Sequence, residues 1–324
     1  MKVLFVTGGN NPAFPIAPFI RAQGASLEKE GVTVGYYPVK GKGLMGYLRH
    51  VRPLKRQIRQ DGYDIIHAHY AFCGWLAWLA APQKPLVVSL MGSDTYGSVN
   101  RQGKRTLRSI PVLWQSKLLN LFADALIVKS SNLMKYVWLK KKATLIPNGV
   151  DYSMFKPGST QEAKAALGLD NGRKHILFAG NPEDPRKNFL LAKEAVDVLT
   201  ASGTEVTLHA PYPIPHHMMQ TWYNAADLLL STSWLEGSPN VIKEALACNC
   251  PVVATPAGDT ATLLSGVEAC AVAVWHPEEL AKSMQRVLGE ESRSNGRECI
   301  AELEEGHIAR RVIEVYRQAY SKRS

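Results

Sequence analysis

The amino-acid sequence predicts an α/β protein made of two doubly wound domains with a cleft between them. Short apolar runs alternate with helical patterns from residue 2 onward, and near-continuous apolar strands between helices indicate parallel sheets covered on both faces. The pattern restarts after a Pro/Gly-rich stretch at 147–158. A chain of 324 residues has room for two domains of ordinary size.

The predicted elements follow the two series in order. The strands of the first series cover 2–6, 32–37, 64–69, 85–90, 125–130 and 143–147. Those of the second series cover 174–180, 205–210, 227–233, 251–255 and 269–274. The chain from residue 290 onward is predicted to be helical. We therefore expect domains over 1–150 and 151–305, and a final helix over 306–324 that packs back toward the first domain.

Composition restricts the class of protein. Hydrophobic residues make up 46% of the chain and charged residues 20%, which is typical of a soluble globular protein. No apolar run approaches the ~20 residues of a membrane-spanning helix, and the first apolar run is too short for a secretory signal. The five cysteines are scattered, and Cys248 and Cys250 lack the spacing of a zinc or redox motif. We expect a cytoplasmic protein with reduced thiols.

Charge is distributed unevenly along the chain. Residues 1–150 hold 21 Lys and Arg against 6 Asp and Glu, which gives +15. Residues 151–324 hold 17 against 22, which gives −5. Such asymmetry indicates that the first half meets an anionic partner. No basic stripe interleaved with aromatic residues supports nucleic acid as that partner.

The most basic segment, residues 39–60, has the pattern of an amphipathic helix and holds seven Lys or Arg and no acid. Its arginines at three- and four-residue spacing are Arg49, Arg52, Arg56 and Arg59. Its apolar residues on another side are Leu48, Val51, Leu54 and Ile58. Basic amphipathic helices lie on anionic membrane surfaces. The alternative is an ordinary surface helix that packs on its sheet.

Two glutamates, Glu236 and Glu244, stand on either side of a predicted helix start. Ser238 is a preferred N-cap residue, and Pro239 suits the first helical position. A phosphate bound at this helix start would have a carboxylate on each side, and each could accept hydrogen bonds from sugar hydroxyls. A nucleotide sugar has this layout. The alternative is an ordinary capped helix with two solvated glutamates.

Two further loops after strands suit a diphosphate. Arg186 and Lys187 stand in the loop before a predicted helix, where an Arg fork and a Lys point charge can neutralise phosphates. Gly8 and Gly9 follow the first strand and permit close approach of a ligand to the backbone. This glycine pair lacks the third glycine of a dinucleotide fingerprint. The agreement of three loops favours a diphosphate ligand.

The sequence resembles the retaining glycosyltransferases of family 4, whose GT-B fold has two facing Rossmann-like domains. EGSPNVIKEALACNCPVVAT at 236–255 resembles that family's motif of two glutamates separated by seven residues. FAGNPEDPRKN at 178–188 resembles its phosphate loop, and PNGVD at 147–151 its domain junction. The segment at 8–34 resembles its glycine loop and first helix. The resemblance covers nearly the whole chain.

The resemblance implies a donor site in the C-terminal domain and an acceptor site in the N-terminal domain. Glu236 would hold hydroxyls of the donor hexose, and Glu244 would hold the ribose. Arg186 and Lys187 would bind the diphosphate and stabilise it as it leaves. The other residues implied in donor binding are Gly8, Gly9, Asn181, Ser238, Asn240 and Val241. Such enzymes generally need no metal and no other cofactor.

Two positions depart from the family pattern. Asn181 stands where many relatives have an arginine, and Met91 stands where they commonly have a histidine before Gly-x-Asp. Met91 cannot donate the hydrogen bond that a histidine gives to the donor sugar. Asp94 is the nearest ionisable residue that could contact an acceptor, and the alternative is that it caps a turn.

Together these inferences predict a retaining glycosyltransferase that associates peripherally with the anionic inner leaflet. It would move a hexose from a UDP- or GDP-hexose to a glycan or lipid-linked acceptor in cell-envelope polysaccharide synthesis. The alternatives are a nucleotide-sugar epimerase or hydrolase of GT-B shape, and a catalytically weak nucleotide-sugar-binding protein.

Overall fold

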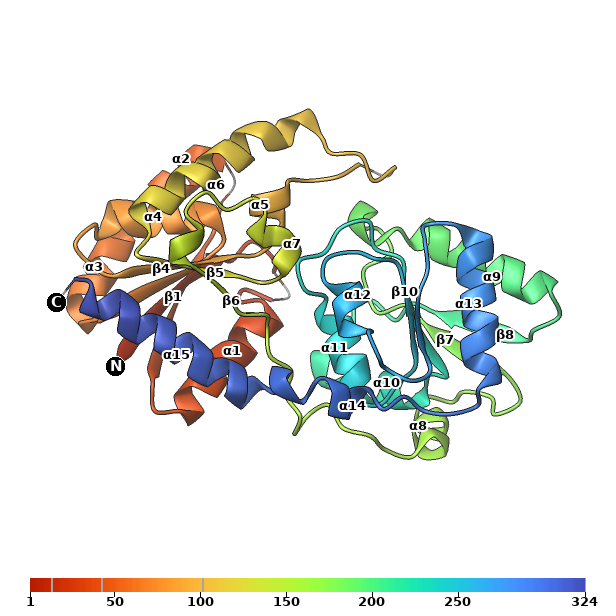
Figure 1. Cartoon of the computed structure of the whole chain (residues 1–324). Helices are drawn as coiled ribbons and strands as arrows, with labels where there is room; N and C mark the ends of the chain where they lie inside the picture. The colour runs from red at the N-terminus through yellow and green to blue at the C-terminus, as the bar shows by residue number, and fades with distance from the viewer. Residues whose placement is uncertain (13, 42, 101, 324) are drawn as a thin grey trace. The chain divides into compact units, whose positions relative to one another are not determined.

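The chain folds into two units, each built on one parallel sheet (Figure 1). The computed structural model describes residues 1–12, 14–41, 43–100 and 102–323. Unit 1 comprises Met1–Ser98, Thr106–Gly149 and Glu305–Ser324, and unit 2 comprises Val99–Arg105 and Val150–Glu304. The predicted fold class, two doubly wound α/β domains, is confirmed.

The strands of unit 1 lie in the order β2-β1-β3-β4-β5-β6 and are parallel. Their bounds are β1 (Lys2–Gly8), β2 (Thr33–Val39), β3 (Ile65–His69), β4 (Leu86–Leu90), β5 (Ala125–Val128) and β6 (Ala143–Leu145). The strand order reverses between β1 and β3, so the loops after these two strands flank the point at which doubly wound sheets bind ligands.

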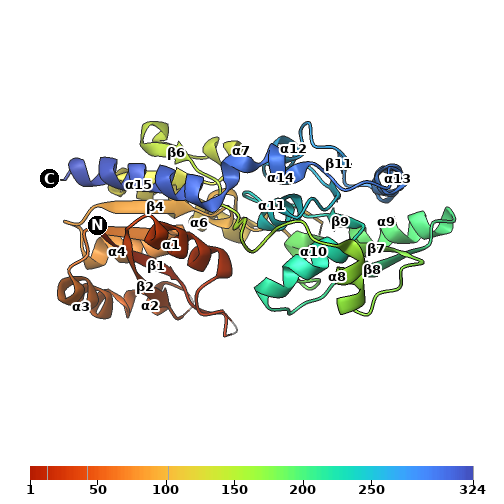
Figure 2. The ribbon, with the colours of Figure 1, turned by 90° about the horizontal axis from the view of Figure 1, so that it is seen from below.

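Helices cover both faces of this sheet. Their bounds are α1 (Pro18–Lys29), α2 (Gly43–Leu48), α3 (Val51–Asp61), α4 (Ala71–Ala80), α5 (Ser93–Tyr96), α6 (Ile110–Phe122), α7 (Ser131–Met134) and α15 (Glu305–Ser321). Helices α1 and α15 pack side by side on one face (Figures 1 and 2). On the other face α3 packs against α4, and α4 packs against α6.

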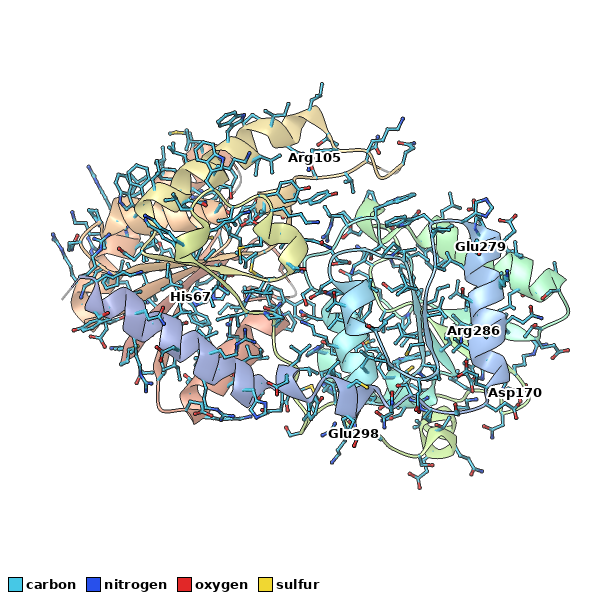
Figure 3. The ribbon with its side chains drawn as sticks, viewed as in Figure 1. His67, Arg105, Asp170, Glu279, Arg286 and Glu298 are labelled. Carbon is cyan, nitrogen blue, oxygen red and sulfur yellow. The ribbon has the colours of Figure 1, made fainter. Side chains whose placement is uncertain are left out.

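Helix α15 is tied to unit 1 through a buried hydrogen bond. The Tyr316 hydroxyl lies 2.6 Å from Nδ1 of His67, whose Nε2 lies 2.8 Å from the Ser89 hydroxyl; Figure 3 shows where His67 lies. Burial holds the pKa of His67 well below its usual value. Lys29 of α1 forms an ion pair with Glu305 at 2.7 Å. Since the ring is neutral and both its nitrogens are engaged, this contact fixes α15 against β3.

The basic segment at 39–60 is not one helix. Helix α2 ends at Leu48 and α3 begins at Val51, because Pro53 cannot donate to the carbonyl of residue 49 and its ring clashes there. Leu54 and Ile58 of α3 are buried in the core, so the apolar side of this helix packs on the sheet. The arginines of the segment are exposed. Lys42, which belongs to the predicted segment, lies outside the described residues.

The strands of unit 2 lie in the order β11-β10-β9-β7-β8 and are also parallel. Their bounds are β7 (Lys174–Leu177), β8 (Val206–His209), β9 (Leu228–Ser231), β10 (Val252–Ala254) and β11 (Cys270–Val272). The helices are α8 (Thr160–Ala166), α9 (Phe189–Ala201), α10 (Met219–Ala225), α11 (Asn240–Ala247), α12 (Thr260–Leu263), α13 (Pro277–Gly289) and α14 (Gly296–Cys299). The order reverses between β7 and β9, which places their following loops at the ligand-binding edge.

The core of unit 2 explains why its strands read as continuous apolar runs. Leu177 and Leu229 pack on one side of the sheet, in the cluster that includes helix α11. Their neighbours Ile176 and Leu228 pack on the other side, against α9 and α13. Successive side chains of a strand point to opposite faces. A sheet covered on both faces therefore needs apolar residues at every position of its strands.

The predicted continuous helix from residue 290 is wrong. Helix α13 ends at Gly289, and Glu291 has a positive φ of 49°. The chain then runs without helix to α14, and α15 begins at Glu305. Arg293 explains this path, because its guanidinium donates to the carbonyls of Tyr223, Ala226 and Cys248 at 2.7–3.2 Å.

Candidate functional site

The loops after β7 and β9 are fastened together at the carboxyl edge of the unit 2 sheet. The Thr232 hydroxyl is 3.1 Å from the Lys187 carbonyl and 2.9 Å from that of Asn188. The Trp234 N–H donates to the Arg186 carbonyl at 2.8 Å. Because β7 and β9 are neighbours in the sheet, residues distant in sequence form one site.

The centre of this site is an ion pair between Lys187 and Glu236. Lys187 Nζ lies 2.7 Å from Glu236 Oε1, and the side chains are 19% and 12% exposed. The Ser233 hydroxyl donates to the same oxygen at 2.9 Å. Burial acts to raise the pKa of Glu236, but Lys187, Arg186 and the Ser233 hydrogen bond outweigh it and hold the pKa below its usual value. Glu236 is therefore ionised at neutral pH.

Arg186 is held in a fixed orientation by Asp184. Its Nη2 lies 2.6 Å from Asp184 Oδ2 and its Nε 3.3 Å from Oδ1. The Asp184 carboxylate also caps the short turn Pro185–Lys187 by accepting the Arg186 N–H at 3.0 Å. Asn181 closes the start of this loop, since its side chain accepts the Glu183 N–H at 3.0 Å. The loop thus holds the side chains of Arg186 and Lys187 close to the Glu236 carboxylate.

Helix α11 begins one residue later than the sequence predicted. Pro239 is the N-cap residue, and Asn240 and Val241 form the first helical positions. The prediction that Ser238 caps the helix is wrong, because Pro239 occupies the N-cap position. Proline has no side-chain acceptor, and no side chain caps the helix. Helix geometry still aims the N–H groups of the first turn along the axis toward the loop that carries Glu236.

The loop after β10 packs closely behind this helix start. Gly258 has a φ of +65°, and a Cβ on it would lie 2.6 Å from the Gly237 carbonyl oxygen. Two ionisable residues that the sequence analysis missed lie near by, Lys243 and Asp259. Lys243 is fully buried, and burial lowers its pKa to about 8 against the attraction of Asp259 and Glu244. Burial also raises the pKa of Asp259.

Glu244 has a different set of partners. His216 Nε2 lies 2.9 Å from one of its oxygens, and the Tyr223 hydroxyl donates to the other at 2.8 Å. The hydrogen bond to Glu244 raises the pKa of His216 above its usual value, although burial opposes this. No sequence motif singled out His216 or Tyr223. The Pro-rich run APYPIPHH at 210–217, directly after β8, was the available signal for a loop that turns back.

Unit 1 carries the remaining predicted positions. A Cβ on Gly8 would meet no atom within 4 Å, whereas one on Gly9 would lie 2.8 Å from Pro38 Cβ. Asp94 is fully buried and accepts the N–H groups of Ala71, Met91 and Gly92 at 2.9–3.0 Å. Burial raises its pKa to about 6, against these hydrogen bonds. Asp94 therefore holds two turns together, and its contact with an acceptor stays a prediction.

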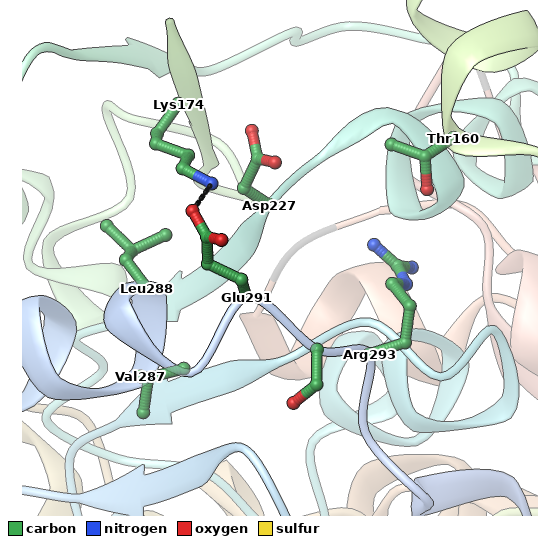
Figure 4. A pocket seen from close by; sticks show the side chains of 8 residues that line it. Thr160, Lys174, Asp227, Val287, Leu288, Glu291 and Arg293 are labelled. Carbon is green, nitrogen blue, oxygen red and sulfur yellow. Dashed lines mark ion pairs between the residues drawn. The ribbon is translucent and has the colours of Figure 1, made fainter.

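A polar hollow of about 220 Å³ lies elsewhere on unit 2 (Figure 4). Its ion pair joins Lys174, the first residue of β7, to Glu291 at 3.6 Å. Asp227, just before β9, pairs with the buried Lys164 at 3.0 Å. These residues stand at the amino ends of the strands, the edge opposite the loops of the candidate site, and their charges are matched within the hollow. We read them as structural.

Among the residues that the structure describes, no group of three or more His, Cys, Asp or Glu side chains could hold a metal ion. Nor does the described part of the chain contain a helix that is both long and apolar enough to cross a membrane.

Comparison with sequence families matches both parts of the chain. Residues 3–153 match Glycosyltransferase Family 4, and residues 175–290 match Glycosyl transferases group 1. The chain belongs to glycosyltransferase family 4. This family 4 chain is 24% identical to a D-inositol 3-phosphate glycosyltransferase of Streptosporangium roseum, over 79% of this chain and 70% of that protein.

Solved structures share the GT-B architecture of this family 4 glycosyltransferase. Sucrose-phosphate synthase from Thermosynechococcus elongatus is similar with a TM-score of 0.79 and 22% identity, covering 99% of this chain and 100% of that chain. Anabaena HepE in complex with UDP-glucose is similar with a TM-score of 0.72 and 18% identity, covering 98% and 99%. At this identity the likeness establishes the fold.

Proposed function

We propose that this family 4 glycosyltransferase moves a hexose, with retention of configuration, from a UDP- or GDP-hexose to a glycan or lipid-linked acceptor. The proposed setting is cell-envelope polysaccharide synthesis at the anionic inner leaflet. The observation that carries the donor assignment is the Lys187–Glu236 ion pair, which lies where the loops after β7 and β9 meet. That edge of a doubly wound sheet is where nucleotides bind.

The ion pair suits a ligand that offers both phosphates and hydroxyls. Without a ligand, Lys187 and Glu236 neutralise each other at 2.7 Å. A nucleotide sugar supplies diphosphate oxygens for Lys187 and hexose hydroxyls for Glu236, so Lys187 gains an anionic partner and Glu236 gains hydrogen-bond donors in place of the ion pair. Arg186, already oriented by Asp184, adds a second cation for the diphosphate.

In the proposed reaction these cations act on the leaving group. The bond between the hexose C1 and the diphosphate oxygen breaks, and its electron pair goes to the diphosphate. Arg186 and Lys187 stabilise that developing charge, so we expect no metal to be required. The acceptor hydroxyl oxygen forms the new bond to C1 on the same face, and its proton passes to the departing diphosphate oxygen. The curated relative named for D-inositol 3-phosphate supports a hydroxylated acceptor as a class.

The proposal is tested first by donor binding. A panel of UDP- and GDP-hexoses is added to the purified protein and the midpoint of thermal unfolding is measured. A ligand at about 100 times its Kd adds ~2.7 kcal/mol to the free energy of unfolding, so one sugar nucleotide should raise the midpoint by several degrees. If none shifts it, the donor assignment is wrong.

Retention is tested on the product. The stabilising donor is incubated with candidate acceptors, and the anomeric configuration of the product is read by proton NMR. Retained configuration supports the proposal, and inverted configuration rejects the mechanism. Binding of the donor without transfer to any acceptor or to water would favour the alternative of a nucleotide-sugar-binding protein.

A further inference from the structure

The outward side of α6 and of the turn before it is a continuous apolar stripe. Leu107, Ile110, Trp114, Leu118 and Leu121 follow one another at intervals of three or four residues, which places helical residues on one side. All five are exposed, Leu107 by 82% and Trp114 by 59%. Single exposed apolar residues are ordinary, whereas a contiguous row indicates a surface that meets something other than water.

The opposite side of α6 already packs within unit 1. Leu119 is fully buried, and the Phe122 ring lies 5.2 Å from that of Trp75 and 4.7 Å from that of Trp78, both in α4. Lys117 is the one charged residue between Ile110 and Phe122. A helix that is apolar on both sides needs an apolar environment for each, and the side of α6 that carries the stripe is exposed.

A second tryptophan and a lysine lie beside the stripe. The rings of Trp138 and Trp114 are 5.8 Å apart at 85°, and Trp138 is 49% exposed. Lys117 Nζ lies 5.7 Å from the centroid of each ring. Tryptophan has an apolar body and a polar N–H, and it is enriched at the membrane–water interface. A cation at the same level can meet lipid phosphates.

The sequence on either side of the stripe is strongly basic. Residues 95–150 contain ten Lys or Arg and a single acid, Asp124, which forms an ion pair with Arg323 at 2.8 Å. The exposed lysines in the segment that carries Trp138 are Lys135, Lys140 and Lys141. This charge is the complement of an anionic surface, where each nearby Lys or Arg adds attraction.

Helix α3 adds cations to the same helical layer. Arg52, Arg56 and Arg59 are exposed, while the apolar side of α3 is buried. Because α3 packs against α4 and α4 against α6, the outward sides of these helices form one surface of unit 1. The surface has arginines at one end and the apolar stripe at the other. Exposed tryptophans beside an excess of positive charge are complementary to the headgroup layer of an anionic bilayer.

We propose that the outward surface of the layer α3–α4–α6 docks unit 1 on an anionic lipid bilayer. The α6 stripe enters the interfacial region with Trp114 and Trp138 at headgroup level, and the lysines and the α3 arginines bind lipid phosphates. The inference deepens the proposed membrane partner and rests on that part of the proposed function alone. It assigns the apolar contribution to α6 and a purely electrostatic one to α3.

The test compares three variants with the parent protein by co-sedimentation with vesicles. A stripe variant carries Trp114→Ser, Leu118→Ser and Leu121→Ser. An arginine variant carries Arg52→Gln, Arg56→Gln and Arg59→Gln. A matched control carries Val272→Ser and Val274→Ser, which removes exposed apolar side chains from unit 2. Vesicles of phosphatidylcholine with and without phosphatidylglycerol are used at 0.1 and 1 M salt.

The parent should bind the anionic vesicles at 0.1 M salt and keep a weaker fraction bound at 1 M, where the screening length falls to ~3 Å. The stripe variant should lose at least tenfold in binding at both salts. The arginine variant should lose the salt-sensitive part, about fivefold for each residue, and keep the salt-resistant part. The control should bind as the parent does.

Two outcomes would overturn the inference. The first is a correctly folded stripe variant, shown by unchanged circular dichroism, that binds anionic vesicles as well as the parent. The second is a parent that sediments as a dimer and a stripe variant that sediments as a monomer with unchanged vesicle binding, which would assign the stripe to a second copy. UDP and GDP calorimetry on the same samples reports on the donor proposal separately.

Discussion

The two glutamates of the motif differ in the partners that hold them. Glu236 stands in the loop before α11, paired with a lysine at 2.7 Å. Glu244 lies within α11 and is held by His216 and Tyr223 at 2.9 and 2.8 Å. Histidine exchanges its proton within the physiological range, and the hydrogen bond to Glu244 raises the pKa of His216 above its usual value. One motif therefore contains a carboxylate in an ion pair with a lysine and a second carboxylate beside a titratable histidine.

The largest effect is expected when the cations beside Glu236 are removed. Replacing Arg186 and Lys187 by Ala together should weaken binding of UDP or GDP by about 1.5–3 kcal/mol for each charge-assisted hydrogen bond lost. Calorimetry measures this directly. Lys193→Ala is the matched control, because Lys193 is exposed on α9 in the same part of unit 2. Equal nucleotide affinity in the double variant and the control would contradict the diphosphate assignment.

Glu236→Gln should separate sugar contact from nucleotide contact. Transfer should fall by one to two orders of magnitude, because a charge-assisted hydrogen bond to the hexose is worth about 1.5–3 kcal/mol. Affinity for the bare nucleotide should change little, since Glu236 contacts only the hexose in the proposal. The checks are initial rates of transfer and UDP or GDP calorimetry. A variant that transfers at the parent rate would remove Glu236 from the site.

The same variant should change stability in acid. Folding lowers the pKa of Glu236. Its contribution to the free energy of unfolding is therefore present above the unfolded pKa of about 4.5 and is lost as pH falls through the folded pKa. Chemical denaturation between pH 3 and 7 should show a shallower loss of stability in Glu236→Gln than in the parent. The partial exposure of the pair limits the difference to about 1 kcal/mol.

Glu244→Gln should weaken binding of the bare nucleotide, because Glu244 contacts its ribose in the proposal. We expect a loss of about 1–2 kcal/mol, smaller than that from the two cations, because the neutral amide retains one acceptor. The sharper measurement uses the 2′,3′-dideoxy form of the same nucleotide. The parent should prefer the natural nucleotide over the dideoxy form, and Glu244→Gln should lose that preference. A preference that survives the substitution would place the ribose elsewhere.

His216 should give the smallest effect, seen only as a pH dependence. Its pKa is raised by Glu244, so its contribution to stability is present below about pH 6.5 and is lost as pH rises through the folded value. Protonated His216 also competes with ribose for Glu244. Nucleotide affinity should therefore rise severalfold as pH rises from 6 to 8 in the parent and stay flat in His216→Gln. Parallel profiles would mean that His216 does not compete.

The sequence predicts the strands and the loops after them well, because burial on both faces requires the apolar runs that mark 174–180 and 227–233. It predicts Lys187 and Glu236 separately. Their ion pair was missed because strand order brings β7 beside β9, and no local pattern encodes that order. His216 was missed for the same reason, since it reaches Glu244 by a loop from β8, on the far side of β7.

Local rules failed where tertiary contacts compete with them. Ser238 is a preferred N-cap residue, yet the helix begins after Pro239 and the serine hydroxyl is buried. The helix expected from residue 290 is interrupted because Arg293 is drawn onto three carbonyls of neighbouring segments. The arginines at 39–60 suggested a membrane helix, but their apolar side is core. The exposed apolar stripe is in α6, which has almost no charge to attract notice.

Unit 1 is not continuous in sequence: α15 returns to it after the whole of unit 2 has been traversed. During synthesis, most of unit 1 therefore leaves the ribosome before unit 2, and α15 leaves it after unit 2. Until α15 emerges, His67 lacks its Tyr316 partner, and the sheet face beside α1 stays uncovered. Unit 2 can close its own sheet some 20 residues earlier. The cover that α15 gives to this face of the unit 1 sheet therefore waits for the synthesis of unit 2.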